Sequence, residues 1–98
     1  MIDLTKVENI YLYTGTTDFR LRLNGLTMLI LSRFGNRERL NNSLFVFCSK
    51  TRTKINIVLF EEGSKSLYQK HLEKGKFFYP DKGDVTKITK ENLRILIE

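Results

Sequence analysis

Apolar residues recur along the first third of the chain at two different spacings. Residues 7–13 (VENIYLY) are rich in β-branched and aromatic side chains, which is typical of a strand. The next apolar positions follow at steps of three or four residues, as on one helical face: Phe19, Leu23, Leu26, Ile30 and Phe34. We therefore expect a helix over residues 18–34, capped by Thr16-Thr17-Asp18 and ended by Gly35-Asn36.

The pattern changes to that of strands after residue 43. Residues 36–43 are polar and predict a loop or a short helical turn. The apolar runs 44–48 (LFVFC) and 55–60 (INIVLF) flank a basic linker, as the two arms of a β-hairpin do. Residues 64–72 (SKSLYQKHL) fit either a third strand or a short helix, and Thr89 is expected to cap a short C-terminal helix.

The order of these elements predicts an α+β fold. We expect a small, mostly antiparallel sheet packed against one long N-terminal helix, with a short C-terminal helix. A chain of 98 residues has room for one modest core, so we expect a single domain over residues 1–98.

The composition argues against several classes of site and location. Cys48 is the only cysteine and His71 the only histidine, which excludes a disulfide framework and a multi-cysteine zinc site. We therefore expect no metal and no cofactor. The longest apolar run, residues 28–31, is far shorter than the roughly 20 residues of a membrane span. The first residues show no secretory signal, so we expect a cytoplasmic protein that does not contact a membrane.

Positive charge is concentrated in the middle of the chain. The sequence has 17 Lys and Arg against 11 Asp and Glu, a formal net charge of +6. Residues 50–76 alone hold seven basic and three acidic side chains, a surplus of four. A local surplus of this kind indicates an anionic partner.

The linker of the predicted hairpin is the main candidate for binding nucleic acid. Lys50, Arg52 and Lys54 point to one side if the linker is extended, and form one basic tip if it is a loop. In either case they can reach DNA phosphates. The alternative is a solvated tip whose charges keep a sheet edge soluble. Further candidate cations are Arg20, Arg22, Lys65, Lys70, Lys74 and Lys76.

An apolar surface is the candidate for binding another protein. Leu21, Met28 and Leu31 lie off the main helical stripe and need a second neighbour. Either the C-terminal helix covers them, or they form an exposed patch that marks an interaction site. Four consecutive residues are assigned to the same partner-binding role: Phe77, Phe78, Tyr79 and Pro80.

The sequence gives little support for catalysis. Phosphoryl transfer on DNA usually needs two or three carboxylates that hold metal ions, and the acidic residues show no such spacing. Asp18 is expected to cap the helix rather than act as an acid, and Cys48 is expected in the core. His71 has no identifiable partner. We therefore expect no catalytic residues and no enzyme activity.

Four motifs occur in the order typical of a known family. The first motif is a Gly-x-Thr-Asp turn, and the second is an Asn-Gly-Leu step that follows an Arg. The third is an LFVF strand with a basic turn, and the fourth is an aromatic motif. The matching positions are Gly15, Thr17, Asp18, Arg20, Asn24, Gly25, Leu26, 44–47, Lys50, Arg52, Lys54, Leu72, Glu73, Gly75, Phe77, Tyr79 and Pro80. The pattern resembles the small accessory protein encoded by the second open reading frame of insertion sequence 66 family transposons. This TnpB-type protein is unrelated to the RNA-guided nuclease of the same label.

The resemblance implies a role in DNA transposition beside a separate transposase. Its implied partners are the transposase of the same element and DNA at the element ends, with a homo-oligomer as a further arrangement. We therefore expect a non-enzymatic accessory factor that binds DNA, the transposase or both. The alternative is a protein-interaction module that assembles with or regulates the transposase without contacting DNA.

Overall fold

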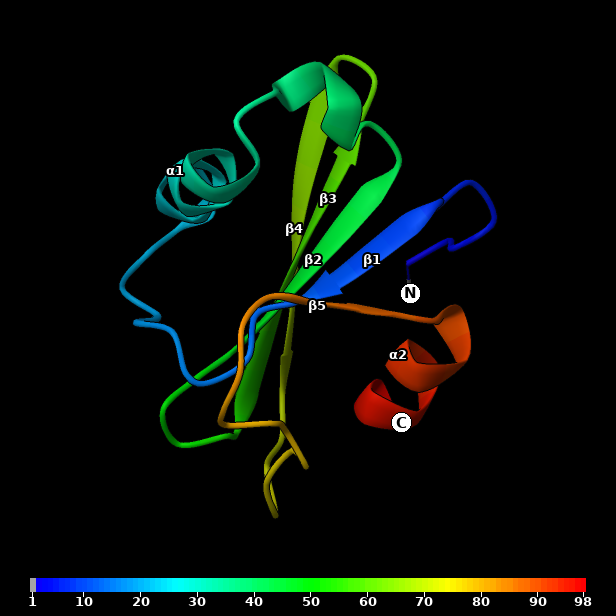
Figure 1. Ribbon diagram of the computed structural model, residues 1–98. Helices are drawn as coiled ribbons and strands as arrows, with labels where there is room; N and C mark the ends of the chain where they lie inside the picture. The colour runs from blue at the N-terminus through cyan, green and yellow to red at the C-terminus, as the bar shows by residue number, and fades with distance from the viewer. Residues whose placement is uncertain (1) are drawn as a thin grey trace.

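The computed structural model describes residues 2–98, and within them one sheet carries a helix on each face (Figure 1). In chain order the elements are β1 (Asn9–Leu12), α1 (Leu23–Phe34), a 3₁₀-helix (Arg37–Leu40), β2 (Ser43–Cys48), β3 (Lys54–Glu61), β4 (Ser64–His71), β5 (Thr86–Ile88) and α2 (Lys90–Ile97). The α+β prediction is confirmed. The predicted long N-terminal helix is the 12-residue α1, which follows β1 rather than opening the fold.

The strands lie in the order β4-β3-β2-β1-β5. β1 and β2 are parallel, with α1 in the connection between them, and every other neighbouring pair is antiparallel. Leu12 pairs with both Val46 and Thr86, so β1 ends beside the last residues of β2 and the first residue of β5. Lys54 pairs with His71 at the same end of the sheet. The loops that leave this end are therefore neighbours in space.

Both faces of the sheet are covered, which accounts for the continuous apolar runs of its two central strands. In β2, Phe45 and Phe47 pack toward α1, while Leu44, Val46 and Cys48 pack toward α2. Figure 1 shows the two helices on opposite sides of the sheet. The α1-side core includes the fully buried α1 residues Leu26 and Ile30, and the α2-side core includes the fully buried Leu93 of α2.

The predicted start of the main helix is wrong by five residues. α1 begins at Leu23, and Arg22 precedes it in an extended conformation without a side-chain cap. Asp18 does not cap the helix, because its carboxylate accepts hydrogen bonds from the backbone and side chain of Arg20. Phe19 packs against the α1-side core from outside the helix, which explains why the apolar spacing continued beyond the helix boundary.

Other predicted elements form as expected. Of the two structures that the sequence of residues 64–72 fits, the strand is confirmed, as β4. Thr89 caps α2 as predicted, in a reciprocal pair of hydrogen bonds with Asn92. The strand β5 was not predicted. It is three residues long, and it lies at the edge with Thr86 and Lys87 exposed, so it has no apolar pattern to reveal it.

Candidate nucleic-acid interface

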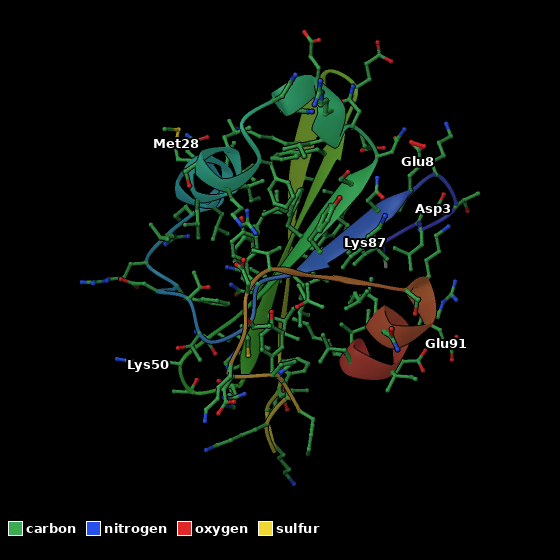
Figure 2. The ribbon with its side chains drawn as sticks, in the orientation of Figure 1. Asp3, Glu8, Met28, Lys50, Lys87 and Glu91 are labelled. Carbon is green, nitrogen blue, oxygen red and sulfur yellow. The ribbon has the colours of Figure 1, made fainter. Side chains whose placement is uncertain are left out.

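Three loops meet at the end of the sheet where β1, β2 and β4 finish. They are residues 13–22, 49–54 and 72–85, and we call them together the basic end. They hold eight of the 17 basic residues and four of the 11 acidic residues. The loops at the opposite end, residues 35–42 and 61–63, hold two basic and three acidic residues. The net positive charge of the loops is therefore concentrated at one end of the sheet, the end at which Lys50 lies in Figure 2.

The first two of these loops enclose a hollow of about 450 Å³. They are held together by a hydrogen bond from the backbone N–H of Thr17 to the carbonyl oxygen of Cys48, with an N–O distance of 2.9 Å. The cations Arg20, Lys50 and Lys54 line the hollow together with hydroxyl side chains such as Ser49. The structure thus brings together three cations that the sequence placed on two separate segments.

Arg20 is held by Asp18 on the wall of this hollow. The guanidinium donates from Nε and Nη2 to the carboxylate, at 3.0 and 2.7 Å from Oδ2, and the backbone N–H of Arg20 donates to Oδ1 at 2.9 Å. These bonds, with the charges of Arg20 and Lys50, lower the pKa of Asp18 to about 2. The Arg20 side chain is nevertheless 91% exposed, so the rest of its guanidinium faces solvent.

The predicted basic ribbon is a turn in which the Arg52 side chain is half-buried against the loop 72–85. Arg52 adopts a left-handed backbone conformation with φ of 62°. Its guanidinium donates to the carbonyl oxygen of Tyr79 and lies 3.8 Å from the carboxylate of Asp81. The backbone N–H of Phe77 donates in turn to the carbonyl oxygen of Arg52 at 2.7 Å. Arg52 therefore joins two loops of the basic end instead of lining one face with Lys50 and Lys54.

Six other cations of the basic end form no ion pair with any residue in the range 2–98: Arg22, Lys50, Lys54, Lys74, Lys76 and Lys82. Their charges are available to an anion. Two other candidates are not part of this group. Lys65 lies near the opposite end of the sheet, 3.3 Å from Asn24 Oδ1, and Lys70 donates to the carbonyl oxygen of Ile97. Lys82 was missed because nothing in the sequence showed that its loop returns to this end.

The aromatic segment divides into buried and exposed residues. Phe77 and Tyr79 are only 6% and 5% exposed and belong to the α2-side core, so the prediction that they form a partner-binding surface is wrong. The Tyr79 hydroxyl lies within hydrogen-bonding distance of the carbonyl oxygens of Tyr13, at 2.6 Å, and Val46, at 3.0 Å. Phe78 is 99% exposed and Pro80 is also exposed, so both remain available to a partner.

The apolar residues of α1 are covered only in part. Leu21 and Leu31 are half-buried against the α1-side core. Met28 is 68% exposed and points away from the sheet (Figure 2), and Leu29 is 36% exposed. The C-terminal helix does not cover these residues, because α2 packs on the other face of the sheet. The exposed patch on α1 therefore consists of Met28 and Leu29, and we call it the α1 patch.

The remaining reactive groups occupy structural or isolated positions. Cys48 is fully buried in the α2-side core, as predicted, and burial raises the pKa of its thiol. His71 is exposed at the end of β4. Within residues 2–98 no three His, Cys, Asp or Glu side chains are grouped as a metal site would require. Across the same residues, no helix has the length and apolar character needed to span a membrane.

A comparison with protein families identifies the chain. The model of the family described as IS66 Orf2 like protein matches residues 8–98. The chain therefore belongs to the IS66 Orf2-like family, in agreement with the resemblance of its motifs. Searches of curated proteins and of solved structures gave no match. The family match extends over every helix and strand of the fold and over all three loops of the basic end.

Proposed function

We propose that this IS66 Orf2-like protein is a non-enzymatic accessory factor for insertion-sequence transposition, and that it binds DNA phosphates through the basic end. The observation that carries the proposal is the set of six cations, unpaired within residues 2–98, that three segments bring to one end of the sheet. Lys and Arg contacts to phosphates supply most of the sequence-independent affinity of DNA-binding proteins, and they fix how the protein is oriented on the duplex.

The chemistry of the basic hollow suits a phosphate group. Lys50 and Lys54 supply ammonium groups from one wall, and the Arg20 guanidinium lies on the other. Hydroxyls from Ser49 and Thr51 add neutral hydrogen-bonding groups of the kind that contact DNA backbones. A hollow of about 450 Å³ that opens to solvent has room for a phosphate that remains attached to its chain.

Solubility alone explains this arrangement less well. Charges that only protect a sheet from aggregation are needed along its exposed edges, and the longest exposed edge here is β4. The unpaired cations instead lie in loops beyond the strand ends or, in the case of Lys54, at the first residue of β3, while the opposite end of the sheet has a small acidic excess. This polarity favours binding to an anionic partner at one end.

The α1 patch supports a second candidate function, a contact with the transposase. Met28 and Leu29 are exposed on a helix whose other face is already packed against the sheet. Neighbouring exposed apolar side chains on a folded helix are a common feature of protein interaction sites. This contact is compatible with DNA binding, because Met28 and Leu29 are not residues of the basic end.

The test is binding to a labelled DNA fragment that carries the ends of the element, with and without its transposase, over a range of salt. If Lys50 and Lys54 each neutralise one phosphate, Lys50→Ala with Lys54→Ala should reduce the log–log salt slope by about 1.8. The wild-type affinity should accordingly fall about 12-fold more than that of the variant between 50 and 200 mM salt.

The matched control is Lys6→Ala with Lys87→Ala, which removes the same charge at positions outside the basic end. The control should retain nearly the full salt slope. Equal slopes for the wild type, the variant and the control would contradict DNA binding through the basic end. Binding to the transposase without any binding to DNA would favour the second candidate instead.

A further inference from the structure

Among residues 2–98, Phe78 is the most exposed large apolar side chain, at 99% of its full accessible surface. It lies between two aromatic residues, Phe77 and Tyr79, that are almost completely buried. Full exposure of a phenyl ring forgoes the stabilisation that burial would provide, so it needs an explanation other than folding. The sequence around it is an extended loop in which alternate side chains face the core and the solvent.

The backbone on both sides of Phe78 is held in place. On one side, the N–H of Phe77 donates to the carbonyl oxygen of Arg52 at 2.7 Å. On the other side, the carbonyl oxygen of Tyr79 accepts from the Arg52 guanidinium, and the Tyr79 hydroxyl bonds to the end of β1. The backbone that carries Phe78 is therefore fixed on both sides, so little conformational freedom remains to be lost when the ring binds a partner.

Phe78 lies in a loop with three lysines whose charges are unpaired. Lys74, Lys76 and Lys82 form no ion pair among residues 2–98. The loop also holds three acidic residues, but Asp81 faces the Arg52 guanidinium and Asp84 pairs with Arg33 at 2.8 Å, which leaves Glu73 as the third. In Figure 1 the loop, coloured yellow to orange, extends beyond the ends of the strands. An exposed aromatic ring among free lysines is the combination by which proteins bind single-stranded nucleic acid.

We infer that Phe78 stacks on an unpaired base, so that the basic end binds single-stranded or locally opened DNA in preference to intact duplex. The inference rests on the proposed function, because the lysines must hold the phosphates on either side of the stacked base. In an intact duplex the faces of the bases are covered by their neighbours. A phenyl ring can reach a base there only by unstacking one step, which costs free energy.

The test compares a labelled single strand, the matching duplex and the same duplex with a short central mismatch bubble. Phe78→Ala should weaken binding to the single strand and to the bubble by between about 5-fold and about 150-fold, the usual range for loss of one base–aromatic stack. Binding to the intact duplex should change by less than about 2-fold, and the salt slope should stay the same, because no charge is removed. Phe78→Tyr should retain the preference.

A direct readout is available because the protein contains no Trp. Phe78→Trp introduces a single indole whose fluorescence should be quenched when a base stacks on it. Ile95→Ala is the matched control, since Ile95 is 68% exposed on α2, outside the basic end, and it should leave binding to all three DNAs unchanged. Unchanged indole fluorescence on binding a single strand, or an equal loss on single strand and duplex in Phe78→Ala, would overturn the inference.

The proposed function and this inference fail in different ways. If the Lys50 and Lys54 variant and the wild type have equal salt slopes, phosphate binding by the basic end is wrong whatever Phe78 does. If the lysines matter but Phe78→Ala binds every DNA like the wild type, only the stacking role is wrong. A loss of transposase capture in Phe78→Ala, with DNA binding intact, would show that the ring contacts protein and would also overturn the inference.

Discussion

The hydroxyl of Tyr79 lies 2.6 Å from the carbonyl oxygen of Tyr13, a residue 66 positions earlier in the chain. This contact fastens the loop 72–85 to the end of β1, where the loop 13–22 begins. The Arg52 guanidinium donates to the carbonyl oxygen of Tyr79 and so connects the loop 49–54 to the loop 72–85. The cations of the basic end are therefore carried by three loops that hold one another, although no single loop is longer than 14 residues.

We expect Tyr79→Phe to destabilise the protein by about 1–3 kcal/mol, because it removes the hydroxyl donor to the Tyr13 carbonyl oxygen, while the Val46 carbonyl oxygen still accepts from the backbone N–H of Tyr13. The measurement is denaturant unfolding at neutral pH. Tyr68→Phe is the matched control, since Tyr68 is 39% exposed and its hydroxyl makes no hydrogen bond within residues 2–98. A Tyr79 variant as stable as the control would show that the contact contributes little.

The same variant should alter the response to alkaline pH. Burial raises the pKa of Tyr79 above its usual value of about 10, so the folded state favours the protonated phenol. The corresponding stability is fully present below about pH 10 and is lost as the pH rises further. Tyr79→Phe should therefore lose less stability between pH 8 and pH 11 than the wild type. Some dependence will remain, because burial also raises the pKa of Tyr13, to about 12.

Two substitutions at Arg52 should separate its side-chain contacts from its backbone conformation. Arg52→Ala removes the donor to Tyr79 and should cost about 1–3 kcal/mol of unfolding free energy. Arg52→Gly removes the same donor but relieves the left-handed conformation, so it should be more stable than the Ala variant by about 1 kcal/mol. Both should keep most of the salt slope of DNA binding. A slope reduced as much as in the Lys50 and Lys54 variant would place Arg52 on the DNA.

The sequence predicted the hairpin of β2 and β3 correctly because both central strands are buried on two faces, and their apolar runs are continuous. It misplaced the start of α1 because Phe19 continues the helical spacing while lying outside the helix. The alternation of buried and exposed residues at Phe77, Phe78 and Tyr79 has the period of an extended chain, but no local signal says which residues face inward. That choice depends on where the loop 72–85 docks, which is a matter of tertiary contacts.

The candidate site likewise combines features that the sequence predicts with features that depend on tertiary contacts. Lys50 and Lys54 are close in sequence, so their proximity could be predicted. The approach of Arg20 to them depends on the parallel pairing of β1 with β2, and the return of Lys82 depends on the pairing of β5 with β1. Neither pairing leaves a local pattern in the sequence. The side of the sheet that α2 covers is equally a property of the topology, and it decided that the α1 patch stays exposed.

The Asp18 carboxylate forms an ion pair with the Arg20 guanidinium, so Asp18→Asn should strengthen DNA binding. The substitution removes one negative charge and frees the guanidinium for a phosphate, which should steepen the log–log salt slope by about 0.9. Arg20→Ala should not give this gain. An unchanged affinity and slope for Asp18→Asn would mean that Arg20 does not reach DNA even when it is free.

The ionisation of Asp18 gives an independent check on that pair. Because the bonds from Arg20 lower the pKa of Asp18 to about 2, the stability they contribute is fully present above about pH 4. It is lost as the pH falls toward 2. Carboxyl resonances followed by NMR should report the low pKa in the wild type and a higher pKa in Arg20→Ala, where the backbone N–H of residue 20 and the charge of Lys50 still lower it in part.

The α1 patch should be tested by Met28→Glu with Leu29→Glu. Met28 is 68% and Leu29 is 36% exposed, so the double variant should remain folded with a modest loss of stability, measured by denaturant unfolding. If the patch contacts the transposase, the buried carboxylates should abolish capture of the transposase in a pull-down, while DNA binding by the basic end is retained. If the patch instead joins two copies of the chain, the variant should sediment as a smaller species than the wild type.

The matched control for this variant is Asn24→Glu with Ser32→Glu, which places two carboxylates on other exposed positions of the same helix. It should retain partner binding, although it changes the charge of the helix by the same two units. A folded Met28 and Leu29 variant that captures the transposase and sediments like the wild type would show that the patch is not an interface. An accessory role would then have to depend on the basic end, including Phe78.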